Sequence, residues 1–501
     1  MLLQLWITGT IDIKWLIVTG NLFMFGTAYL FYKTLKAEQL SWYYFIPVPY
    51  ILFNLVYSEN AFWGIAAIQN TPVIFWALLA VYGLGRDNRA GWYIGFFSAI
   101  IATFTSGNGM LTWIVGVVFL LYQKNFRFLV IWILAAAAVL SFYFLFEYQL
   151  VPPPPESALS SPLYNALLFF GFLGNALYLD IPHPLVPGFY KDMLACALMG
   201  MFIGMVALLW LVRFIFSRNP KWSYWFLLGA IMFLMGTGAM FVLSRPVFSY
   251  FMYGGDIFSR RYLIFGVVLL AATYVCALIL IKRSLMISRI IAGTFFAVFL
   301  CLNFLSYYNS TATLRKLHAA LELDGYFWTN YHAFLTQGNE FYDVPFWNHP
   351  TRMKNLMSNI ENTGISKPFV PEELASRNLI IPASKKGNLF KGKLDIGISY
   401  RVGGYNQKFK FLTFKIIPTS SADLKYVILK GKERIIVLPL VPVPYDWQET
   451  FAKNTYYSGE YQSEIFRRKL PVDDYEIWVM SKPVSGISST TLFTGKVLSL
   501  K

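Results

Sequence analysis

Long runs of apolar residues alternate with short polar segments over the first 306 residues of the chain. A helix needs about 20 apolar residues to cross a bilayer, and ten runs reach or approach that length. They are Trp15–Tyr32, Trp42–Tyr57, Ala61–Leu84, Gly91–Phe104, Leu111–Tyr122, Phe128–Phe146, Met193–Leu211, Trp222–Leu243, Leu263–Ile281 and Ile290–Tyr307. Residues 1–306 therefore predict a polytopic α-helical membrane domain with about ten transmembrane helices.

One further apolar segment, Tyr164–Tyr178, is only about half as long as a membrane-spanning helix. It follows four consecutive prolines, Pro152–Pro155, within a long connection. The pattern predicts an interfacial or re-entrant helix at the end of the bundle.

The pattern changes after Tyr307. Residues 307–378 predict a connector that begins with a helix over Thr311–Gly338 and continues irregularly. Residues 379–501 alternate with period two in at least six short segments separated by turn residues. They are Lys393–Val402, Lys408–Ile417, Tyr426–Pro439, Glu460–Leu470, Tyr475–Ser481 and Thr490–Leu500. This pattern predicts a mainly-β, sandwich-like domain.

The composition supports a membrane protein and narrows its chemistry. The chain is 56% hydrophobic and only 14% charged, whereas soluble domains carry about 25% charged residues. The net charge of +16 is shared equally, +8 in residues 1–306 (17 basic, 9 acidic) and +8 in 307–501 (25 basic, 17 acidic). Most basic residues of the first part flank apolar runs, so nucleic acid is not a predicted partner.

No cofactor is predicted from motifs. The three cysteines lie inside apolar runs and the four histidines lack metal-ligand spacing, so no metal site is expected. A nucleotide-binding P-loop motif is also absent from the sequence. Whether a divalent metal takes part stays open.

The loop charges alternate along the chain. One set of loops holds twelve basic residues, from Lys33 to Arg289, and the other set holds four, Lys191, Arg245, Arg260 and Arg261. Cytoplasmic loops carry the excess of Lys and Arg. The second set is therefore predicted to be extracytoplasmic, together with everything after Tyr307.

The segment Ser244–Tyr262 concentrates charge between two apolar runs. It holds Arg245, Asp256, Arg260 and Arg261. Charges are costly at membrane depth. Arg245, Arg260 and Arg261 also lie in the predicted extracytoplasmic loops, where basic residues are disfavoured. They are the strongest candidates for an anion site. The turn Gly107-Asn108-Gly109 either exposes backbone N–H groups to an anion or is a simple turn between helices.

Four motifs give the chain a family resemblance. They are Ser58-Glu59-Asn60 with Trp63, Ser106-Gly107-Asn108-Gly109-Met110-Leu111, Phe172-Leu173-Gly174-Asn175, and Ser259-Arg260-Arg261-Tyr262. Residues 1–306 resemble the GT-C superfamily of membrane glycosyltransferases, which use polyprenyl-phosphate-linked sugars, in an uncharacterised bacterial branch. The family's first span and acidic first loop have no counterpart before Trp15, so we expect the chain to be truncated at its start, to be an inactive relative, or to use another acid.

The resemblance implies a role for each matching residue. Arg260 and Arg261 match the residues that hold the lipid phosphate, and Glu59 matches a position that orients a polar group. In place of the family's missing acid, Asp256 and Glu59 are the candidate catalytic carboxylates. The candidate substrate-binding residues are Asn60, Gly107, Asn108, Arg245, Arg260, Arg261 and Tyr262. The implied partners are a polyprenyl-phosphate-linked sugar, a glycan or lipid acceptor, and the lipid bilayer. The implied location is the bacterial cytoplasmic (inner) membrane.

Two other functions stay open. A transporter or flippase of lipid-linked glycans would move its substrate without transferring sugar, although residues 1–306 show no internal repeat. A non-enzymatic scaffold would display the β-domain and tolerate alanine at Glu59, Asp256, Arg260 and Arg261.

Overall fold

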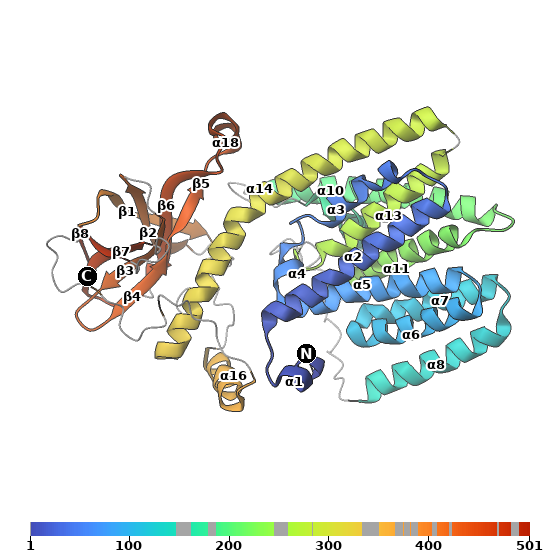
Figure 1. Ribbon diagram of the computed structural model, residues 1–501, viewed down its shortest axis with the longest axis horizontal. Helices are drawn as coiled ribbons and strands as arrows, with labels where there is room; N and C mark the ends of the chain where they lie inside the picture. The colour runs from blue at the N-terminus through green and yellow to red at the C-terminus, as the bar shows by residue number, and fades with distance from the viewer. Residues whose placement is uncertain are drawn as a thin grey trace. The chain divides into compact units, whose positions relative to one another are not determined.

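The chain divides into two compact units. The structure, a computed structural model, describes residues 2–146, 162–178, 187–244, 259–282, 284–332, 350–365, 374, 381, 389–402, 408–419, 423–467, 470–481 and 490–500. One unit comprises Asp12–Ser310, and the other comprises Met1–Ile11 and Thr311–Lys501. They are described here as the helical unit and the β unit (Figure 1).

The helical unit is built from long apolar helices joined by short helical turns. Its longer helices are α2 (Ile13–Ala37), α5 (Gly64–Gly85), α6 (Arg89–Thr105), α7 (Leu111–Tyr122), α8 (Phe126–Leu145), α9 (Pro162–Leu173), α10 (Pro187–Ile215), α11 (Trp222–Ser244), α13 (Leu263–Ile281) and the start of α14 (Leu285–Tyr331). Its short elements are η1 (Trp42–Phe45), α3 (Pro47–Leu52), α4 (Ser58–Phe62), η2 (Gly107–Met110) and η4 (Asn175–Leu177).

Seven helices in the described part of the chain are long and apolar enough to cross a membrane. They are α2, α5, α8, Met193–Ile215 within α10, α11, α13 and α14. The chain therefore has the character of a multi-pass membrane protein, as its sequence predicts. The predicted runs Gly91–Phe104 and Leu111–Tyr122 are helices as well, α6 with 17 residues and α7 with 12.

Helix α13 lies at the centre of the bundle. Of the residues in its most apolar 18-residue stretch, 83% are buried. Helices α5 and α11 are the next most buried, and α8 is mostly exposed.

Close packing between α5 and α6 depends on two glycines that face each other. A Cβ at Gly83 would lie 2.6 Å from the Gly91 carbonyl oxygen, and one at Gly91 would lie 2.3 Å from that of Gly83. Small residues allow the backbones of membrane helices to approach each other this closely.

The predicted span Trp42–Tyr57 is not one helix. It breaks into η1 and α3 and leads to α4. Pro47 and Pro49 explain the break, because proline has no N–H to donate and its ring clashes with the preceding helical turn. Irregular backbone at membrane depth needs other partners for its polar groups.

Helix α14 supplies these partners. The Asn303 amide donates from Nδ2 to the carbonyl oxygens of Tyr50, at 3.0 Å, and Phe53, at 2.8 Å. The Leu55 N–H donates to Ser306 Oγ at 3.1 Å, and Ser310 Oγ donates to the Leu55 carbonyl at 3.3 Å. The broken segment is thus held by a polar stripe on one neighbouring helix.

An ion pair with a buried carboxylate joins three helices at one end of the bundle. Glu38, which follows α2, accepts from Ser223 Oγ at 2.5 Å at the start of α11. It also pairs with Lys282 at the end of α13, and its side chain is fully buried. This contact joins three helices at the end where α2 and α13 finish and α11 begins.

The β unit contains two four-stranded antiparallel sheets. The strands are β1 (Gly392–Val402), β2 (Lys408–Pro418), β3 (Leu424–Lys430), β4 (Ile435–Pro439), β5 (Val441–Pro444), β6 (Tyr457–Phe466), β7 (Asp474–Ser481) and β8 (Thr491–Ser499). The sheet orders are β1-β2-β6-β5 and β4-β3-β7-β8. The predicted strand Tyr426–Pro439 is two strands, because the chain turns at Gly431, whose N–H donates to the Arg434 carbonyl at 2.8 Å.

Both sheets contribute to one hydrophobic core. Phe414 and Ile465 come from the first sheet, and Val427 and Ile477 from the second. The other face of the second sheet holds Trp478 in a further cluster with Leu323 and Phe327 of α14. The unit also includes α1 (Leu2–Thr8), α16 (Pro350–Thr363) and α18 (Trp447–Lys453).

The polar stripe on α14 gives a first prediction. Asn303→Leu keeps the side-chain size but leaves the Tyr50 and Phe53 carbonyls without their donor. We expect a loss of about 1–2 kcal/mol of stability, measured as a lower thermal midpoint of the protein in detergent. Phe304→Leu, at the next and exposed position, should leave the midpoint unchanged. Equal midpoints for the two variants would contradict the role of Asn303.

Candidate functional site

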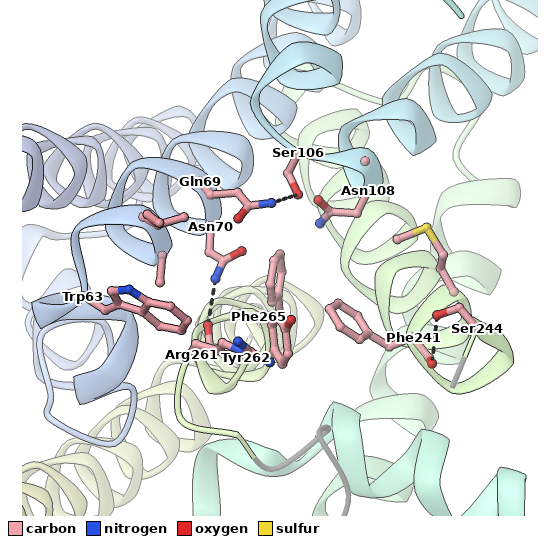
Figure 2. A pocket seen from close by; sticks show the side chains of 14 residues that line it. Trp63, Gln69, Asn70, Ser106, Asn108, Phe241, Ser244, Arg261, Tyr262 and Phe265 are labelled. Atoms are coloured by element: carbon pink, nitrogen blue, oxygen red, sulfur yellow. Dashed lines mark hydrogen bonds between the residues drawn. The ribbon is translucent and has the colours of Figure 1, made fainter. Parts of the chain in front are cut away.

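A cavity of about 250 Å³ lies in the helical unit, at the end of the bundle where α5 and α13 begin and α6 and α11 finish (Figure 2). Its walls combine aromatic rings, amides, hydroxyls and one guanidinium. The lining residues are Trp63, Ile65, Ala66, Gln69, Asn70, Ser106, Gly107, Asn108, Met240, Phe241, Ser244, Arg261, Tyr262 and Phe265.

Arg261 is the only charged lining residue among those the structure describes. The centre of its guanidinium lies 4.8 Å from the Tyr262 ring centroid and 5.5 Å from that of Trp63. In contacts of this kind, the cation is attracted electrostatically to the face of the aromatic ring. Its Nε atom is buried and has no hydrogen-bond partner in the described part of the chain. The guanidinium therefore retains hydrogen-bonding capacity for a ligand.

The backbone of Arg261 is held on both sides. Its N–H donates to Glu59 Oε2 at 3.2 Å, and its carbonyl accepts from Asn70 Nδ2 at 3.0 Å. The same Glu59 oxygen accepts from Ser259 Oγ at 3.0 Å. Because α4 provides Glu59 and α5 provides Asn70, two helices fix the turn that precedes α13. This arrangement sets the position from which the guanidinium projects.

Three amides line the wall shown with Arg261 in Figure 2. Gln69 Nε2 donates to Ser106 Oγ at 3.3 Å, so α5 is linked to the end of α6. Asn108 is 3% exposed, and its Nδ2 donates to Thr237 Oγ1 of α11 at 3.4 Å. Its Oδ1 is buried without a partner in the described residues. Together with Asn70, these side chains present both donors and acceptors.

The short element η2 places Asn108 against the cavity. The Gly109 N–H donates to the Ser106 carbonyl at 2.8 Å, which closes the turn after α6. A Cβ at Gly109 would lie 2.0 Å from the Ala102 carbonyl oxygen, so a larger residue could not pack there. A Cβ at Gly107, by contrast, would meet nothing closer than 3.9 Å. Of the two glycines in this turn, only Gly109 is required by the packing around it.

The lining suits a ligand that has both an anionic group and a polar ring. One cation without an acidic neighbour in the lining favours a phosphate or carboxylate, and no Asp or Glu is among the described lining residues. Aromatic faces at Trp63, Tyr262, Phe241 and Phe265 offer apolar surface to a ring. Amides at Gln69, Asn70 and Asn108 match hydroxyl groups, which donate and accept.

The structure brings most of the predicted site residues to this region. Gly107, Asn108, Arg261 and Tyr262 line the cavity. Glu59 contacts the turn behind it. Arg245 and Asp256 lie outside the described residues.

Arg260 and Asn60 lie beside the cavity but do not line it. Arg260 Nη1 donates to Ser58 Oγ at 3.1 Å and to Ser310 Oγ at 3.4 Å. Asn60 is fully buried and its Nδ2 donates to Thr71 Oγ1 at 2.8 Å. These contacts join α4 to α14 and to α5.

Gln69, Asn70, Phe241 and Phe265 line the cavity without having been predicted. A signal for the two amides was present, since Gln69 and Asn70 are adjacent polar residues inside an apolar run, and polar groups within membrane helices mark functional sites. Phe241 and Phe265 gave no such signal, because each is one apolar residue among many in α11 or α13.

Among the described residues, no group of three or more His, Cys, Asp or Glu side chains could hold a metal ion. Comparison of the chain with protein-family models, curated proteins and solved structures gave no match. The resemblance to the GT-C superfamily therefore stays a prediction.

The Arg261 guanidinium, whose Nε has no partner among the described residues, gives a second prediction. Arg261→Gln should weaken binding of dodecyl phosphate to the purified protein about 10- to 100-fold, since hydrogen bonds to a charged group contribute about 1.5–3 kcal/mol. Isothermal titration calorimetry in an uncharged detergent measures the affinity. Arg218→Gln makes the same charge change at an exposed position after α10 and should bind normally. Equal affinities for both variants would remove Arg261 from the site.

A pair of substitutions at Glu59 gives a third prediction. Glu59→Gln keeps an oxygen that can accept from Ser259 and from the Arg261 N–H, whereas Glu59→Ala removes it. We expect the glutamine variant to bind dodecyl phosphate nearly as well as the original protein and the alanine variant to bind it several-fold more weakly. The same titration measures both. If the glutamine variant binds as poorly as the alanine variant, Glu59 does not act through this turn.

Proposed function

We propose that this protein transfers a sugar from a polyprenyl-phosphate carrier to a lipid or polysaccharide acceptor outside the cytoplasm. The observation that carries the proposal is Arg261, a cation fixed by its backbone beside a cavity whose described lining has no carboxylate. A lipid-linked sugar phosphate supplies one anion and one hydroxyl-rich ring. These are the two chemical groups that the cavity lining matches.

The chemistry needs few protein groups. The bond between the anomeric carbon and the phosphate oxygen breaks, and its electron pair stays on the phosphate. The acceptor hydroxyl oxygen bonds to the anomeric carbon, and its proton passes to a base. Negative charge grows on the leaving phosphate, so a fixed guanidinium stabilises the transition state more than the ground state. Arg261 has this role in the proposal.

The base is one of two carboxylates. Asp256 and Glu59 are the candidate substitutes for the family's acidic residues, which have no counterpart in this sequence. Oxygen Oε2 of Glu59 accepts two hydrogen bonds from the turn at Arg261. A carboxylate has two oxygens and about four acceptor sites, so this contact and proton transfer are compatible.

The membrane arrangement in the proposal has about ten crossings. Helix ends support it: α5 and α13 begin at the cavity, while α2 and α13 finish at the ion pair of Glu38 and Lys282. The broken segment between α2 and α5 then returns the chain from one end of the bundle to the other. Helices α6 and α7, with η2 between them at the cavity, add one hairpin.

We place the cavity end and a sandwich-like β unit on the extracytoplasmic side of a bacterial inner membrane. The loop charges support this side, because Lys33, Lys36 and Arg86 flank the ends of α2 and α5 that lie away from the cavity. The core shared by both sheets supports the sandwich. The location places the cavity on the face where envelope glycans are assembled.

Complementation of a deletion strain tests the function. We expect deletion of the gene to remove one sugar from an envelope glycan or lipid, measured by mass spectrometry. The Arg218→Gln variant should restore that sugar, and Arg261→Gln should not. Asp256→Asn and Glu59→Gln belong in the same panel. At least one of them should lose the sugar while still binding dodecyl phosphate, because it lacks the base.

Three outcomes would overturn the proposal. If deletion leaves every envelope glycan unchanged, or if Arg261→Gln restores the missing sugar, the protein is not this transferase. If the purified protein moves a lipid-linked glycan across liposomes without transferring sugar, it is a transporter. If Asp256→Asn and Glu59→Gln both keep full activity, neither carboxylate is the base.

A further inference from the structure

Helix α16 has an exposed apolar stripe. Its sequence between Pro350 and Thr363 is PTRMKNLMSNIENT, and Leu356, Met357 and Ile360 fall on one face at helical spacing. Leu356 is 41% exposed and Ile360 is 38% exposed. Lys354, on the same helix, is exposed as well. In the β unit, α16 thus presents apolar side chains to its surroundings rather than to a core.

Helix α1 of the same unit is similar in this respect. It is short, Leu2–Thr8, and consists mostly of apolar residues. Trp6 is 84% exposed and Ile7 is 66% exposed. Isolated exposed apolar residues need no explanation, but two whole helical elements of this kind in one unit do.

A backbone hydrogen bond ties the two elements together. The Ile11 N–H, three residues after α1, donates to the Ile365 carbonyl at 2.7 Å. Ile365 is two residues beyond the end of α16. The chain continues from Ile11 through Asp12 into α2, a candidate membrane span that begins at Ile13. Both elements are therefore attached where the chain enters a membrane helix.

We propose that α1 and α16 together form a membrane-surface pad that lies in the headgroup region of the bilayer. The apolar side chains, Trp6 and Ile7 of α1 and Leu356 and Ile360 of α16, would contact the acyl chains. Tryptophan is enriched at this depth, and short helices with an apolar and a polar face lie in the plane of the interface. Lys354 fits anionic headgroups. The bilayer is the partner because the first residue of a membrane span is located at its surface.

The pad has a function separate from sugar transfer. It would anchor the β unit to the lipid surface by a second attachment besides the chain itself. This inference depends on α2 being a membrane span and on nothing in the cavity.

Spin labels on the full-length protein test the pad. A background in which Ser replaces Cys196, Cys276 and Cys301 removes the native cysteines. One label is placed at Ile360→Cys on the apolar stripe, and a matched one at Asn362→Cys on the opposite face. The protein is reconstituted in liposomes of phosphatidylethanolamine and phosphatidylglycerol. Power-saturation electron paramagnetic resonance then compares access by oxygen, which concentrates in lipid, with access by a water-soluble nickel chelate.

The expected result is a ratio of oxygen to nickel access several-fold higher at position 360 than at 362. Leu134→Cys, at an exposed position in α8, calibrates lipid, and Lys432→Cys, at an exposed turn of the β unit, calibrates water. Nickel access at 360 equal to that at 432 would place the stripe in water. Exclusion of both reagents from 360 would mean that protein covers it. Lipid-like ratios at both 360 and 362 would mean an inserted helix. Each of these three results overturns the pad.

Discussion

The helical unit depends on one constraint, that backbone polar groups surrounded by apolar helices must find partners. The segment after α2 cannot form a continuous helix because of Pro47 and Pro49, so its carbonyls and N–H groups need other donors and acceptors. Helix α14 supplies them through Asn303, Ser306 and Ser310. The broken segment leads directly to α4, which carries Glu59. The polar stripe on α14 and the position of the candidate site are therefore physically connected.

The connection continues from Glu59 to the cavity. Its carboxylate and the Asn70 amide hold the two backbone polar groups of Arg261, so the guanidinium is positioned without an ion pair of its own in the described residues. A cation fixed in this way does not need to leave a carboxylate when an anion arrives. Preorganised charge of this kind costs little reorganisation on binding. The aromatic neighbours Trp63 and Tyr262 restrict the side chain further.

Several features were predictable because they depend on local sequence. The apolar runs predicted the long helices, and the period-two segments predicted most strands. The charged segment before α13 was predicted to hold an anion site, and two of its residues, Arg261 and Tyr262, line the cavity. Asn108 of the Gly-Asn-Gly turn, a candidate binding residue, also lines the cavity. The backbone contacts of Glu59 and Asn70 were not predictable, because they join residues about 190 to 200 positions apart. The break at Pro47 was signalled by the prolines, but its partners on α14 were not.

The two ends of the helical bundle differ in how their cations are compensated. At one end Lys282 is neutralised by the buried carboxylate of Glu38, whereas at the other end Glu59 contacts the backbone of Arg261 and the described cavity lining around its guanidinium has rings, amides and hydroxyls but no carboxylate. Lys282 thus already has an anionic partner, whereas the described lining around Arg261 supplies none.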